Sequence, residues 1–104
     1  MTTVFISVRA VDDGLTQASW SEYILAVNGE IRAVADITHG SWVSCPVDPW
    51  RGACWFVELA EAAEAALRGR LIGLAWQHRQ AHVVWAPARV SLLGAVPPPV
   101  LVTR

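Results

Sequence analysis

The chain has 104 residues, of which 54% are hydrophobic, and a formal net charge of −1 at pH 7. This length fits a single domain, the apolar content argues against global disorder, and the charge gives no basic face of the kind that nucleic-acid-binding domains use. No apolar run approaches the roughly 18 residues of a membrane span, and the first residues carry no secretory signal, so we expect a cytoplasmic protein. We predict one α+β domain over residues 1–95 and a proline-rich tail over residues 96–104.

The first third of the sequence predicts three strands. Residues 3–11 alternate apolar and more polar side chains, which is the two-residue period of a strand, and residues 12–14 have turn chemistry. Asn28 and Gly29 lie between two apolar runs within residues 23–35. Because Asn-Gly between such runs favours a two-residue turn, we expect a hairpin here.

The middle of the chain predicts a loop followed by a helix. Residues 38–49 contain glycine, proline and serine and are typical of a connection. Asp48 and Pro49 suit a helix start, since aspartate caps the free N–H groups and proline loses no hydrogen bond at the first helical position. We therefore expect a helix over residues 50–68.

The last third predicts two further strands, over residues 71–77 and 82–86, with Pro87 ending the second or placing it at a sheet edge. Residues 89–93 are a candidate for one more strand. The expected fold is an antiparallel sheet of about five strands with one helix packed on one face, in the order β-β-β-α-β-β. The opposite face is then solvated or binds something.

The histidines and cysteines do not predict a metal site. His78 and His82 are four residues apart in a segment that reads as strand and turn, where that separation spans about 13 Å. Neither they nor His39, Cys45 and Cys54 match the ligand spacing of known metal centres. We predict no metal and no cofactor, and we expect the two cysteines to be reduced thiols.

Catalytic signatures are weak. Cys54 falls in the first turns of the expected helix, where the helix dipole favours a thiolate, but no cysteine-centred motif surrounds it. The sequence has no G-x-S-x-G elbow and no glycine-rich phosphate loop. An enzyme is therefore the third hypothesis for this chain, and no catalytic residue is assigned.

The tryptophans are the most informative feature of the composition. Six indoles are more than a core of this size easily buries, so we expect some of them to be exposed. Exposed tryptophan beside arginine is typical of protein contact sites. We predict Trp42, Trp76, Trp85 and Arg79 as contact residues.

The order of elements resembles small actinobacterial-type domains of unknown function, some of which are similar to immunity proteins of toxin systems. The resemblance is carried by the early strand, the hairpin, Phe56-x-x-Leu59 in the expected helix, and the strand pair that ends in His82-Val83-Val84. It implies a stoichiometric protein-binding role and assigns no functional residue.

These observations favour a non-catalytic binding module that docks on a partner protein or on a second copy of itself, with no nucleic acid or membrane as partner. The alternative is a small-molecule or carbohydrate-binding protein with a groove lined by the same tryptophans.

Overall fold

The computed structural model describes residues 1–10, 16–44 and 51–97. The turn predicted at residues 12–14 and the helix start predicted at Asp48 and Pro49 lie outside these residues. The described elements, in chain order, are β1 (Thr2–Arg9), α1 (Gln17–Val34), β2 (Ile37–Val43), β3 (Gly52–Leu59), α2 (Glu61–Gln77) and β4 (Val84–Ala88).

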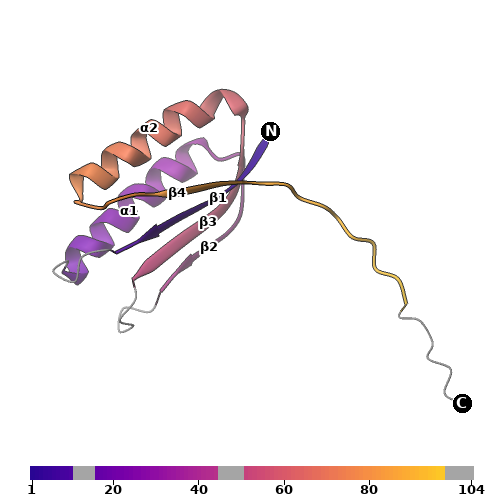
Figure 1. The fold of residues 1–104 in the computed structure, drawn as a ribbon, viewed down its shortest axis with the longest axis horizontal. Helices are drawn as coiled ribbons and strands as arrows, with labels where there is room; N and C mark the ends of the chain where they lie inside the picture. The colour runs from indigo at the N-terminus through magenta and orange to yellow at the C-terminus, as the bar shows by residue number, and fades with distance from the viewer. Residues whose placement is uncertain (11–15, 45–50, 98–104) are drawn as a thin grey trace, which may run out of the picture.

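The strands form an antiparallel sheet in the order β2-β3-β1-β4, and both helices lie on the same face of it (Figure 1). The predicted α+β class with an antiparallel sheet is confirmed, and so is the first strand. The predicted numbers of strands and helices were wrong. The described residues form four strands and two helices, in the order β-α-β-β-α-β.

The predicted hairpin around Asn28 and Gly29 is wrong, because this segment is the second half of α1. Thr16 caps the helix by accepting a hydrogen bond from the backbone N–H of Ser19. The described glycines include none with a positive φ, so the turn geometry that Asn-Gly favours is absent at Gly29. The buried residues follow the three-to-four spacing of a helix: Trp20, Tyr23, Ile24, Val27 and Ile31.

The predicted helix over residues 50–68 is also wrong, since most of it is β3 followed by the start of α2. The buried residues of β3 are every second one, Ala53, Trp55, Val57 and Leu59. The predicted strand over residues 71–77 is the second half of α2, and the predicted loop over residues 38–49 contains most of β2.

The last strand was placed approximately correctly. β4 contains Pro87 and lies at one edge of the sheet, as a proline within a strand requires. Residues 89–97 form neither helix nor strand, so the candidate strand at residues 89–93 is absent. Figure 1 shows this segment leaving the sheet and running away from the rest of the fold.

A side-chain amide ties α1 to the sheet. The Asn28 Oδ1 accepts hydrogen bonds from the indole Nε1 of Trp55, at 3.0 Å, and from the Nε of Arg32, also at 3.0 Å. Trp55 is 1% exposed, so its N–H needs a partner inside the protein. The asparagine that suggested a turn instead satisfies the largest side chain of the core.

Tyr23 of α1 lies in the core, beside the residue that follows α2. Its ring lies 5.0 Å from the His78 ring and 6.1 Å from the Trp20 ring, centroid to centroid. The side chain is fully buried, and its hydroxyl has no hydrogen-bond partner among the described residues. Burial therefore raises the pKa of Tyr23 from 10.0 to about 12, because the phenolate would lose its hydration.

We predict that stability falls at alkaline pH because of Tyr23. The unfolded chain releases this proton near pH 10 and the folded chain near pH 12, so the contribution is complete below pH 10 and is lost as the pH rises to 12. The two-unit difference corresponds to about 2.7 kcal/mol. The chain has one tyrosine and no lysine, so few other groups titrate in this range.

Urea unfolding from pH 8 to 11.5 measures the effect, and the phenolate absorbance at 295 nm identifies the group. Tyr23→Phe removes most of the fall in stability between pH 10 and 11.5. An equal fall in the wild type and the variant would contradict the assignment.

Candidate docking surface

No described element covers the side of the sheet opposite the helices. We call it the open face. It is made by the strand residues that alternate with the buried ones, because successive side chains of a strand point to opposite sides. Its members include Phe5, Arg9, Trp42, Cys54, Phe56 and Glu58.

Large apolar side chains lie exposed in the middle of the open face. Trp42 is 57% exposed and Phe5 is 37% exposed, and the two belong to β2 and β1 on either side of β3. The Trp42 indole folds over Gly40: a Cβ at Gly40 would lie 2.8 Å from its Cη2 atom. Gly40 therefore makes room for the indole to lie along the sheet.

A depression of about 670 Å³ opens beside the Trp42 indole. Phe5 and Cys54 line it together with Trp42, and the guanidinium-bearing residues Arg9 and Arg51 stand at its border. The site thus combines an aromatic floor with positive charge at one end of the sheet.

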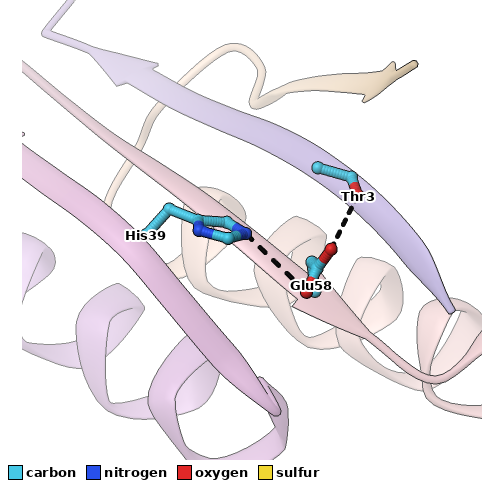
Figure 2. Close-up of polar contacts among 3 residues, drawn as sticks. All are labelled: Thr3, His39 and Glu58. Atoms are coloured by element: carbon cyan, nitrogen blue, oxygen red, sulfur yellow. Dashed lines mark hydrogen bonds and ion pairs between the residues drawn. The ribbon is translucent and has the colours of Figure 1, made fainter. Parts of the chain in front are cut away.

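A polar cluster lies at the other end of the open face. The Glu58 Oε2 is 3.7 Å from the His39 Nε2, an ion pair when the imidazole is protonated, and the Thr3 hydroxyl donates to the Glu58 Oε1 at 3.4 Å (Figure 2). The His39 ring also lies 5.1 Å from the Phe56 ring, centroid to centroid. The cluster joins β1, β2 and β3, and it fixes the carboxylate on the open face.

Cys54 is not at a helix start. It is the third residue of β3 and pairs with Trp42, so no helix dipole acts on it. Burial raises the pKa of the Cys54 thiol, against a smaller lowering by a backbone hydrogen bond at Trp42. The structure therefore favours the neutral thiol, which removes the physical reason for a cysteine nucleophile.

The predicted contact residues do not form one cluster. Trp42 lies on the open face, as described. Trp85 faces the helices, where the Arg68 guanidinium carbon lies 5.6 Å from its ring centroid. Trp76 is 84% exposed near the end of α2, and Arg79 follows two residues after that helix. Sequence reasoning missed Phe56 as a surface residue because its segment was predicted as a helix.

Arg79 ends α2 in a left-handed conformation, with φ at 57°. The backbone N–H of Gln80 donates to the Ala75 carbonyl at 2.7 Å, and the N–H of Arg79 donates to the Trp76 carbonyl at 3.2 Å. This is the hydrogen-bond pattern of a Schellman motif, in which glycine is the usual residue at the left-handed position. Because Arg79 is not a glycine, this left-handed backbone lowers the free energy of unfolding.

In the part of the chain that the structure describes, no group of three or more histidine, cysteine, aspartate or glutamate residues is arranged to hold a metal ion. Within the same residues, neither helix combines the length and the apolar character that crossing a membrane requires.

Comparison with known proteins identifies the fold. No family model matches the chain, and no curated protein matches it. The chain is similar to the solution structure of a hypothetical protein from Arabidopsis thaliana, with a TM-score of 0.56 and 12% sequence identity. The match covers 90% of this chain and 92% of that one. At this identity the similarity shows a shared arrangement of helices and strands.

We predict that Arg79→Gly stabilises the protein by about 0.5–1 kcal/mol. Glycine relieves the cost of the left-handed backbone, and part of that gain is offset by the greater freedom of glycine in the unfolded chain. Chemical denaturation of the two proteins measures the difference. Arg79→Ala is the control, since it removes the guanidinium and keeps the backbone cost. Lower stability of the glycine variant would show instead that the arginine side chain stabilises the fold.

Proposed function

We propose that this domain is a non-catalytic docking module, that the open face is its contact surface, and that its partner is a second copy of the chain. The observation that carries the proposal is the exposed apolar surface of that face: Phe5, Trp42 and Val84 lie between its charged ends and Ile37 lies beside Glu58, and each of the four is between 37% and 57% exposed. An apolar centre bordered by polar and charged side chains is the usual anatomy of a protein interface.

The charges of the open face support a second copy as the partner. Arg9 pairs with Gly52 at one end of the sheet, whereas Glu58 pairs with Thr3 at the other end. A two-fold axis that reverses the strand direction places Arg9 of one copy near Glu58 of the other, and does so twice. The face is therefore complementary to itself in charge, while its centre is apolar in both copies.

The immunity-protein resemblance adds little to this proposal. It was carried by a hairpin and by a helix around Phe56 and Leu59, and those segments form α1 and β3 instead. What remains is the stoichiometric docking role, which now rests on the open face.

We predict that the double variant Phe5→Ser, Trp42→Ala raises the dimer Kd at least about tenfold, because it removes the apolar centre. Size-exclusion chromatography with light scattering, over a concentration series, measures the Kd, and far-UV dichroism checks the fold. The matched control is Ile72→Ser, which removes an apolar side chain that is 67% exposed on α2. A monomeric wild type at all concentrations, or an unchanged Kd in the double variant, would overturn the proposal.

A charge-reversal cycle tests the two-fold arrangement in the same assay. Arg9→Glu alone and Glu58→Arg alone should each weaken the dimer, since each creates like charges across the interface, and the combined variant should recover part of the loss. Additive losses in the combined variant would contradict the predicted pairing of these two side chains.

A second candidate function is the binding of a small ligand on the same face. The depression of about 670 Å³ beside Trp42 lies within the size range of ligand sites, and Arg9 at its border could bind an anionic group. Tryptophan fluorescence across a panel of sugars and aromatic carboxylates tests it, with Trp42→Phe as the control. A change in the wild type that Trp42→Phe abolishes supports the ligand site, and no change with any compound rejects it for those classes.

A further inference from the structure

The segment that follows β4 is apolar and has no cover from its own domain. From here on, the name tail means residues 89–97, which begin before the proline-rich stretch predicted over residues 96–104. Leu92 is 96% exposed, Leu93 is 91% exposed and Val96 is 81% exposed. Figure 1 shows the tail extending from the sheet without folding back on it. A contiguous apolar segment of this kind is rarely left in water by a folded protein.

The sequence of the tail opposes a return to its own open face. The chain would have to reverse direction directly after Ala88, where β4 ends. Residues 89–93 are Arg-Val-Ser-Leu-Leu, and Gly94 is the first glycine after β4. Tight turns favour glycine, proline, asparagine, aspartate and serine, of which residues 89–93 contain Ser91 alone. A neighbouring molecule is therefore easier for the tail to reach than its own sheet.

The edge of β2 is suited to receive an extended segment. β2 and β4 are the two outer strands of the sheet. Pro87 interrupts the outer edge of β4, because proline lacks an N–H. β2 has the sequence Ile-Thr-His-Gly-Ser-Trp-Val, with no proline, lysine or acidic residue, and its bulge between Thr38 and Gly40 leaves the following residues in regular register. It lacks most of the devices that keep an edge strand from pairing.

An apolar groove of about 280 Å³ lies at the Val43 end of this edge, on the helix side of the sheet. Trp20, Ile24 and Leu25 of α1 line it together with Val43 of β2. Leu25 is 71% exposed and Val43 is 59% exposed, so both have apolar surface available to a partner.

We infer that the tail of one copy lies along β2 of a second copy and places one row of its side chains in the groove between β2 and α1. In an extended chain, adjacent residues point to opposite sides, so Leu92 and Leu93 face two different surfaces. A strand added at β2 has two such surfaces, the groove on one side and the open face on the other. The nine residues span about 30 Å when extended, enough to follow the seven residues of β2.

This inference rests on the proposed self-association, and a two-fold axis makes the exchange of tails reciprocal. The test therefore pairs a donor variant with an acceptor variant of the full chain. The donor variant is Leu92→Asp, Leu93→Asp, and the acceptor variant is Leu25→Asp. Ile72→Asp is the control, because Ile72 lies on α2 away from the groove.

Each variant alone should raise the dimer Kd at least about tenfold, since every tail-groove contact is lost in its homodimer. A mixture of the donor and acceptor variants should form more heterodimer than either forms homodimer, because one intact tail then meets one intact groove. Differently tagged copies and native mass spectrometry measure the three species. A mixture that associates no better than the separate variants would overturn the exchange.

Disulfide trapping provides a second readout. With both native cysteines replaced by serine, Leu25→Cys and Leu93→Cys in one chain should give an intermolecular disulfide on mild oxidation. A disulfide within one chain would overturn the second copy as occupant.

The two proposals can fail separately. If the donor and acceptor variants leave the Kd unchanged while Phe5→Ser, Trp42→Ala raises it, the tail exchange is wrong and the open-face interface stands. If Phe5→Ser, Trp42→Ala leaves the Kd unchanged, the open-face interface is wrong, whether or not the tail variants change the Kd.

Discussion

The helices cover only one face of the sheet, and this constraint determines which strand residues are buried and which are exposed. Both helices pack on the same face, so each strand contributes alternate residues to the core and leaves the others uncovered. Trp55 lies at the centre of that arrangement, fully buried and held by the Asn28 side chain of α1. The strand that supplies Trp55 to the core also supplies Cys54, Phe56 and Glu58 to the open face. The same short strands therefore supply both the core and the open face. A one-residue change of register in β3 would move its core side chains to the open face and its open-face side chains to the core.

The sequence predicted some elements correctly, and its errors have physical causes. β1 was predicted because its apolar and polar residues alternate clearly, and because residues 12–14, which follow it, have turn chemistry that opposes a longer helix. α1 was missed because Asn28 and Gly29 are strong local turn signals, whereas the helical spacing of buried residues from Trp20 to Ile31 extends over 12 positions and needs the whole segment to be seen. The packing of that apolar stripe outweighs the propensity of two residues. In β3, Ala53, Phe56 and Leu59 also fit the three-residue spacing of a helix, and the choice between strand and helix depends on partners that lie far away in the sequence.

The same errors limited what could be predicted of the contact surface. Trp42 was chosen as a tryptophan expected to be exposed, and the structure gives it a position on the open face. Trp85 was chosen on the same ground and faces the helices, where it packs beneath Arg68. Residue type thus identifies side chains that are costly to leave exposed, and strand register decides which of them are buried by the chain itself. Phe56 could have been found from the alternation of residues 53–59, had that segment been interpreted as a strand.

The open face, the bare edge of β2 and the apolar tail belong to the same physical problem. A four-stranded sheet with helices on one side has an uncovered face and two free edges, and the residues that the structure describes form no further helix or strand with which to cover them. Proteins usually protect such surfaces with charge, proline or an added layer. Here β4 carries the proline and the ends of the open face carry opposite charges. β2 has no proline, lysine or acidic residue along its described length. An apolar tail that its own domain does not use is the complement of that unprotected edge, and two copies contain two such tails and two β2 edges.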